Sequence, residues 1–325
     1  MKLPQEFFSQ QLLAQRAASP RTIASYRDAI RLLLQFTEKR LRKAPTDLAM
    51  EDLDSTLVLE FLDHLEKERG NSARSRNLRL TTVRSFMKFS ALRDPSSLAV
   101  AQRVLAIPTK RFDRRMVGFL SRREVDSILD APDGSTWSGR RDRVLFATLY
   151  NTGARVSEII GVRRRDLILE GVACVRLLGK GRKERAVPLR RTTARDLRRW
   201  LDQIEGGEER PVFPNRGGQA LSRSGVEDRL DAAVRLAEAT CISLRGRQIS
   251  PHTFRHSTAM HLLQAGVDVT VIALWLGHEN PATTHLYVEA DLAMKERALA
   301  KVQPTRSGIG RFRPGDGLLA FLEAL

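Results

Sequence analysis

Residues 250–260 read SPHTFRHSTAM, a stretch that predicts a helix with cationic side chains near its N-terminus. Ser250 is a residue type that favours the N-cap of a helix, and proline is favoured at the next position. His252 and Arg255 are three residues apart, so we expect them to share a face at the positive end of the helix dipole. The stretch therefore predicts an anion-binding site.

A zinc site is disfavoured at the same place. His252 and His256 have the i, i+4 spacing of zinc ligands, but Thr253 stands where a metalloprotease helix has its glutamate. The two cysteines, Cys174 and Cys241, are too few for a four-thiolate site. The sequence therefore predicts no metal and no cofactor.

Three further segments each place a functional group beside a glycine turn. Residues 151–158, NTGARVSE, have an arginine just after a helix-ending glycine. Residues 172–189, VACVRLLGKGRKERAVPL, predict a β-hairpin with a lysine at its tip. Residues 274–287, LWLGHENPATTHLY, predict a helix end followed by a histidine and then by a tyrosine. The four groups are Arg155, Lys180, His278 and Tyr287. The other two tyrosines, Tyr26 and Tyr150, lie in apolar helical patterns that are typical of a core.

Taken in order, the four segments resemble the tyrosine recombinases, also called the phage integrase family. The resemblance covers residues 119–300 and implies an active site in which Glu158 supports the first arginine. The implied catalytic residues are Arg155, Lys180, His252, Arg255, His278 and Tyr287. Glu289 stands where many members have a histidine, a difference that removes none of these groups.

The implied set fits transesterification at a DNA phosphodiester. Tyr287 is the expected nucleophile and would become joined to a 3′ phosphate. The two arginines would bind the nonbridging oxygens and stabilise the charge that develops on them. Lys180 would protonate the 5′ oxygen, and His252 would assist proton transfer at the tyrosine. His278 would donate a hydrogen bond to the phosphate, and neither a metal ion nor ATP is required.

The charge of the chain indicates a polyanion as partner. Its 325 residues include 55 Lys and Arg against 38 Asp and Glu, a formal net charge of +17. Residues 1–106 contribute +6 and residues 107–325 contribute +11. We therefore expect two basic bodies that grip the same polyanion, DNA or RNA. The family resemblance implies that this partner is double-stranded DNA containing specific recombination sites. A solvated basic surface is the alternative.

No apolar run is long enough to span a bilayer, and residues 1–11 lack the pattern of a secretory signal. We expect a cytoplasmic protein, associated with the nucleoid when bound to DNA, and no membrane partner.

The expected fold is mainly α, because Ser19-Pro20, Asp54 and Ser72 predict three helix starts in the first third. Four parts are expected along the chain. They are a helical domain over residues 1–106, a linker over 107–118, an α-rich domain with a small antiparallel β-sheet over 119–300, and a tail over 301–325. The family resemblance implies that the first is a SAM-like core-binding domain and the third the catalytic domain.

One face of the third helix is a candidate DNA contact. Asn77, Arg84 and Lys88 recur at helical spacing, on a different face from an apolar stripe that includes Leu78 and Phe86. The pattern fits phosphate binding and a solvated basic face equally well. The residues predicted to contact DNA are Arg76, Arg84, Lys88, Arg111 and Arg114.

The family resemblance also implies a homo-oligomer, expected to be a tetramer on two DNA sites, whose subunits exchange C-terminal segments. Residues 316–325 predict a short helix with one apolar stripe, and a helix this short needs a docking surface. Docking on a neighbouring subunit and docking on the same subunit both remain open. The stripe consists of Leu318, Phe321, Leu322 and Leu325.

Two functions compete with that of an integrase, transposase or resolvase. A type IB topoisomerase relaxes DNA with similar catalytic groups, and a DNA-binding regulator could keep the fold without the chemistry. The separate helical domain and the apolar C-terminal stripe favour recombination over relaxation. The six filled active-site positions argue against a noncatalytic regulator.

Overall fold

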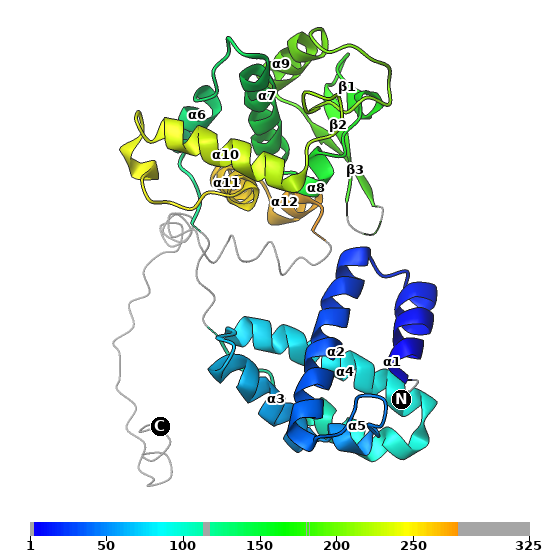
Figure 1. The fold of residues 1–325 in the computed structure, drawn as a ribbon. Coiled ribbons are helices and arrows are strands. Elements are labelled where there is room, and N and C mark those ends of the chain that lie inside the picture. Colours follow the sequence, from blue (N-terminus) through cyan, green and yellow to red (C-terminus); the bar gives the residue numbers. More distant parts are fainter. Residues whose placement is uncertain (1–2, 113–117, 180, 182, 279–325) are drawn as a thin grey trace, which may run out of the picture. The chain divides into compact units, whose positions relative to one another are not determined.

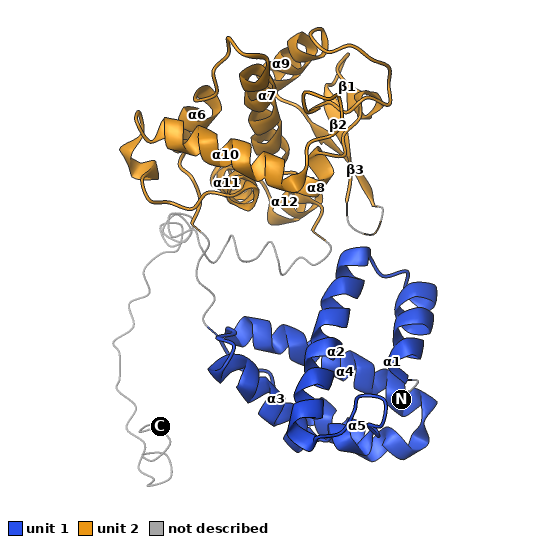
Figure 2. Cartoon of the chain, in the orientation of Figure 1, with its two compact units in different colours: residues 1–115 blue, residues 116–325 orange. Residues whose placement is uncertain are grey.

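The computed structural model describes residues 3–112, 118–179, 181 and 183–278 (Figure 1). The chain divides into two compact units, Met1–Arg115 and Met116–Leu325 (Figure 2). Each unit has its own hydrophobic core. Within the described ranges, no helix is both long enough and apolar enough to cross a membrane.

The first unit is built from helices. Its elements are α1 (Leu3–Glu6), a π-helical segment (Phe7–Gln15), α2 (Pro20–Leu41), a 3-10 turn (Glu51–Leu53), α3 (Ser55–Lys67), α4 (Ala73–Arg93), a second 3-10 turn (Pro95–Ser97) and α5 (Leu98–Ala106). The predicted helix starts are confirmed, because Ser19, Asp54 and Ser72 each accept a backbone N–H of the first turn.

The core of this unit is mainly aliphatic with several phenylalanines, and it includes residues of α2, α3 and α4. Phe7, Phe61 and Phe86 are almost fully buried there. The predicted stripe on α4 is wrong in one position, since Leu78 is 56% exposed. Leu80 and Val83 are buried instead, so the buried face of α4 lies to one side of the predicted stripe.

The second unit combines helices with one small sheet. Its helices are α6 (Arg122–Asp130), α7 (Trp137–Thr152), α8 (Val156–Ile159), α9 (Arg191–Leu201), α10 (Arg223–Ala237), α11 (Pro251–Gln264) and α12 (Val269–Leu276), with 3-10 turns at Arg164–Asp166 and Ile242–Leu244. Its strands are β1 (Leu167–Ile168), β2 (Cys174–Leu178) and β3 (Glu184–Pro188). The expected mainly α fold with a small antiparallel sheet is confirmed.

The sheet has the order β1-β2-β3 and is antiparallel throughout. Val175 pairs with Val187, and both side chains are buried. Helix α7 runs through the middle of the unit and packs against α6, α9 and α11 (Figure 1). The C-terminal end of α7 contacts the sheet, through the bond from Asn151 Nδ2 to the Pro188 carbonyl, and α7 also packs against α11. The candidate site lies at this end of α7.

Candidate active site

The end of α12 is a Schellman turn that leaves carbonyl groups in need of donors. Gly277 has a φ of +65°, and its N–H donates to the Leu274 carbonyl at 3.1 Å. The N–H of His278 donates to the Ala273 carbonyl at 2.9 Å. These two bonds define the motif. The next carbonyls, of residues 275–277, lie at the negative end of the helix dipole.

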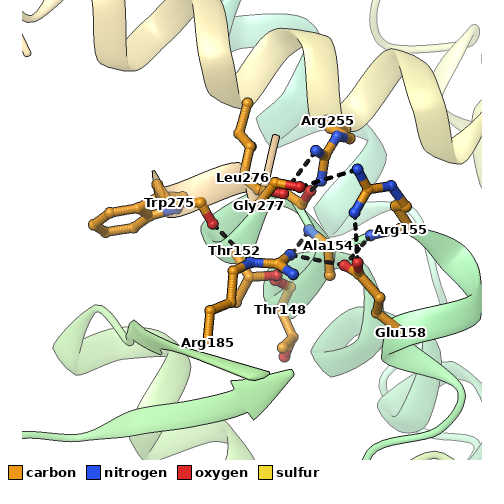
Figure 3. A network of polar contacts seen from close by, with 11 residues as sticks. Thr148, Thr152, Ala154, Arg155, Glu158, Arg185, Arg255, Trp275, Leu276 and Gly277 are labelled. Atoms are coloured by element: carbon orange, nitrogen blue, oxygen red, sulfur yellow. Dashed lines mark hydrogen bonds and ion pairs between the residues drawn. The ribbon is translucent and has the colours of Figure 1, made fainter. Parts of the chain in front are cut away.

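Three guanidinium groups from three separate segments donate to those carbonyls (Figure 3). The bonds are Arg185 Nε to Trp275 (2.9 Å), Arg255 Nη2 to Leu276 (2.7 Å) and Arg155 Nη2 to Gly277 (3.2 Å). Each cation therefore lies at the negative pole of one helix. We name this arrangement of Arg155, Arg185 and Arg255 around residues 275–277 the arginine cap.

A tight turn after α7 brings two of these arginines together. Gly153 ends α7 with a φ of +58°, and Arg155 is the N-cap of α8 two residues later. Arg255 donates from Nη1 to the Gly153 carbonyl at 2.6 Å. A Cβ at Gly153 would lie 2.5 Å from Leu276 Cδ2, so any side chain at this left-handed position would force Leu276 to move.

Glu158 joins two members of the arginine cap. Its Oε1 accepts from Arg155 Nη1 at 2.7 Å, and its Oε2 accepts from Arg185 Nη2 at 2.7 Å and from the Arg155 backbone N–H at 2.9 Å. Burial acts to raise the pKa of this carboxyl, but the bonds from Arg185 and Arg155 outweigh burial, so the pKa lies below its usual value. Glu158 is therefore a buried carboxylate that fixes both guanidinium groups.

Two histidines lie in the positive field of the same cluster. Burial and then the charges of Arg255 and Arg155 lower the pKa of His278 to about 4. Burial and the charges of Arg255, Arg223 and Arg155 also lower the pKa of His252. Both imidazoles are therefore neutral at pH 7, and each keeps one N–H donor and one nitrogen acceptor.

Comparison with known proteins assigns these features to one family. Residues 118–294 match the model of the phage integrase family, and residues 6–94 match the N-terminal SAM-like domain of phage integrases. The chain belongs to the phage integrase family. The predicted tyrosine recombinase, an enzyme of site-specific DNA recombination, is thereby confirmed.

Relatives and solved structures agree with this assignment. The chain is 51% identical to a putative integrase/recombinase of Sinorhizobium fredii, over 99% of this chain and 97% of that protein. It is 32% identical to the tyrosine recombinase XerC of Pelobacter propionicus, over 91% and 94% of the two chains. A crystal structure of the XerH site-specific recombinase bound to palindromic difH substrate has the same fold, with a TM-score of 0.69 and 20% identity over 88% and 81% of the two chains.

The structure brings part of the predicted site together. Arg155, Glu158 and Arg255 meet at the end of α12, and His252 and His278 lie close enough to be affected by the charges of the arginines. Lys180 and Tyr287 lie outside the described residues, as do Glu289 and the apolar stripe of residues 318–325. Within the part of the chain that is described, no cluster of three His, Cys, Asp or Glu side chains could hold a metal ion.

Sequence analysis missed Arg185, the third member of the arginine cap. In β3, Arg185 alternates with exposed Glu184 and Ala186 and shares a face with buried Val187. Side chains on one face of a strand point the same way, so Arg185 points inward. An inward-pointing arginine needs partners, and this alternation is the signal that could have found it.

The DNA contacts predicted in the first unit need one correction. Arg76 is only 3% exposed, and its Nε lies 3.5 Å from Glu66 Oε2. The prediction that Arg76 offers its charge to DNA is therefore wrong, because α3 covers it with a carboxylate. Lys88 and Arg111 are exposed, and Arg114 lies outside the described residues.

Arg84 has a structural contact of its own. Its Nη2 donates to the Ile107 carbonyl, and the side chain is half-buried. Nearby, Asn77 Nδ2 donates to the Lys110 carbonyl at 2.8 Å and Asn77 Oδ1 accepts from the Lys110 N–H at 3.1 Å. Lys110 Nζ also lies 2.6 Å from Glu66 Oε2. The face of α4 predicted for DNA thus holds the first residues of the predicted linker. We name these contacts of Asn77, Arg84 and Glu66 with Ile107 and Lys110 the linker anchor.

Proposed function

We propose that the chain cuts and rejoins DNA through a covalent 3′-phosphotyrosine at Tyr287, with one phosphate held by Arg155 and Arg255. The observation that carries the proposal is that these two guanidinium groups donate to the neighbouring carbonyls of Leu276 and Gly277. Groups fixed on adjacent oxygens lie close enough to share one phosphate. Their bonds to backbone hold them in place before DNA binds, which favours stabilisation of the transition state over reorganisation.

The proposed reaction exchanges one phosphoester for another. The phenolic oxygen of Tyr287 forms a bond to phosphorus, the bond from phosphorus to the 5′ oxygen breaks, and Lys180 gives its proton to that oxygen. A neutral His252 is suited to accept the phenolic proton, and a neutral His278 is suited to donate a hydrogen bond to the phosphate. Attack by the 5′ hydroxyl of another strand reverses these steps and releases the tyrosine.

The environments of the other tyrosines support Tyr287 as nucleophile. The chain has three tyrosines. Tyr150 is 6% exposed and its hydroxyl lies 2.6 Å from His261 Nδ1, while Tyr26 is half-buried against Phe7. The Tyr150 hydroxyl is therefore already engaged, and Tyr26 belongs to the first unit, whereas Arg155 and Arg255 belong to the second.

Several finer features belong to the same proposal. The substrate is double-stranded DNA with specific recombination sites, in line with the XerH site-specific recombinase, whose crystal structure contains palindromic difH substrate. We propose a tetramer on two such sites, with the C-terminal segment shared between subunits. The protein would act in the cytoplasm, on nucleoid DNA. The charge of +17 supports a DNA partner.

A nicked suicide duplex carrying the recombination site that the protein recognises tests the proposal. We expect the wild-type protein to form a covalent adduct with the 3′ end and Tyr287→Phe to form none. An adduct with the Phe variant would contradict the nucleophile assignment. Relaxation of a plasmid that lacks the site would indicate topoisomerase activity, and binding without any adduct would indicate a regulator.

The two arginines have their own expected result. Arg155→Ala and Arg255→Ala should slow adduct formation far more than they weaken binding, because their contacts strengthen as charge develops on the phosphate. Both rates and affinities are measured on the same duplex. Equal losses in cleavage and binding would mean that the arginines act only in binding or folding.

A further inference from the structure

Arg185 contacts both sides of the site from the second position of β3. Its Nη2 donates to Glu158 Oε2 at 2.7 Å and its Nε donates to the Trp275 carbonyl at 2.9 Å (Figure 3). The side chain is 12% exposed. A cation this buried is stable only where acceptors surround it, and here the acceptors come from α8 and from the end of α12.

The same residue is rigidly joined to the β-hairpin. Arg185 pairs with Leu177 across β2 and β3, and the Gly179 N–H donates to the Lys183 carbonyl at 2.8 Å one step further on. A Cβ at Gly179 would lie 3.3 Å from Glu158 Oε1 and 3.6 Å from Arg185 Nη1. The hairpin therefore approaches Glu158 closely, just before the predicted position of its lysine.

We infer that Arg185 is a positioning residue that holds the β-hairpin, Glu158 and the end of α12 in one fixed arrangement. It thereby sets the place of Arg155 and His278 relative to the hairpin that carries the proposed acid. The inference rests on the proposed function for its catalytic consequence. It adds a residue that touches no reacting atom and acts through Glu158 and the α12 carbonyls.

Loss of Arg185 should change both geometry and electrostatics. Without the bond from Arg185 to the Trp275 carbonyl, the end of α12 loses one of the three hydrogen bonds of the arginine cap. The catalytic groups can then shift, and a shift of about 1 Å at a catalytic group can slow a reaction about 100-fold. Arg185 also makes the largest hydrogen-bond contribution to the low pKa of Glu158, and its charge helps to lower the pKa of His278. Both pKa values should therefore rise in Arg185→Gln.

The first test compares Arg185→Gln, Arg185→Lys and a matched control, Arg176→Gln. Arg176 lies on β2 of the same hairpin, is exposed, and makes none of these contacts. At saturating DNA, adduct formation on the suicide duplex should slow on the order of 100-fold in Arg185→Gln and recover in part in Arg185→Lys. In Arg185→Gln, the acidic limb of the pH–rate profile should move to higher pH. The control should match wild type in rate and pH profile.

The second test needs no DNA. The His278 resonance is titrated by NMR in wild type, Arg185→Gln and Arg176→Gln, after urea unfolding has shown that each variant is folded. A higher pKa in Arg185→Gln alone supports the inference. An unchanged pKa together with a wild-type adduct rate overturns it, while failure of wild type itself to form an adduct overturns only the proposed function.

A double variant separates positioning from general loss of stability. Because Arg185 acts in part through Glu158, adding Arg185→Gln to Glu158→Gln should slow adduct formation by a smaller factor than Arg185→Gln alone slows the wild type. Multiplied rate losses would mean that the two residues act independently and would contradict the inference.

Discussion

At the scale of single residues, the site is built on guanidinium groups that bind backbone oxygens. Arg255 donates to the carbonyls of Gly153 and Leu276, from two different elements. Arginine has five N–H donors in a fixed plane, so one face can be tied to the protein while other donors meet a ligand. For Arg155, two of the five side-chain donors bond Glu158 and Gly277, so three remain for the phosphate of the proposed reaction.

His278 should remain neutral down to about pH 5. Its pKa in the folded protein is about 4, whereas the ordinary value is 6.5. The folded state therefore resists protonation, and this contribution to stability is complete above pH 6.5 and is lost as pH falls toward 4. Between pH 7 and pH 5, wild type should lose more free energy of unfolding than His278→Gln, as measured with urea. A His278 resonance that titrates near pH 6.5 would contradict this.

Some site residues could be identified from the sequence and others could not. Arg155 and His278 each follow a glycine that ends a helix, and that local signal marked their positions. The burial of Arg76 depends on Glu66 of α3, which local periodicity on α4 does not reveal. Arg185 gave a local signal, the inward face of a strand, but its partners come from α8 and α12.

At the scale of elements, the end of α12 depends on its glycine. A side chain at φ +65° costs about 1–2 kcal/mol, and a Cβ at Gly277 would lie 2.9 Å from Arg185 Nη1. Gly277→Ala should therefore lower the free energy of unfolding and also slow adduct formation. Gly171→Ala is the control, because Gly171 has φ +62° but no atom within 4 Å. The control should lose stability only. Equal rates in the two variants would mean that the contact with Arg185 is unimportant.

The linker anchor should protect the first residues of the predicted linker from cleavage by a protease. Asn77→Ala removes both side-chain bonds to the Lys110 backbone, which should raise the population of the open segment on the order of tenfold. Trypsin cleavage after Lys110, followed by mass spectrometry without DNA, measures this. Gln102→Ala on α5 is an exposed control outside the anchor. Identical cleavage rates in the two variants would show that Asn77 does not hold the segment.

The helices and strands differ in how well they can be predicted from the sequence. The capping box at Ser121 and Glu124 is a feature that sequence alone can reveal, because all its atoms come from four consecutive residues. Helix α9 was not predicted, since residues 191–201 are mostly polar and only Leu197 and Trp200 supply large buried side chains. β1 has two residues and exists only through its pairing with β2.

At the scale of the whole molecule, the distribution of charge governs DNA affinity. Positive charge lies on both parts of the sequence, +6 on residues 1–106 and +11 on the rest. If phosphate contacts dominate, the logarithm of the association constant should fall linearly with the logarithm of salt concentration. Replacing exposed Arg111 by glutamine should reduce that slope by about 0.9 if it contacts one phosphate. Binding that stays constant with salt would contradict a role for both parts.

The arginine cap also limits how the gene can vary in length. Its three bonds join residues 21, 90 and 122 positions apart in the chain. One codon inserted within α12 would rotate the helix end by about 100° and break all three bonds at once. The turn around Gly171 is free of this restriction, since the space beside it is open. Size variation among homologues, and any fluorescent or affinity insert, therefore belongs in that turn and not between Val269 and Gly277.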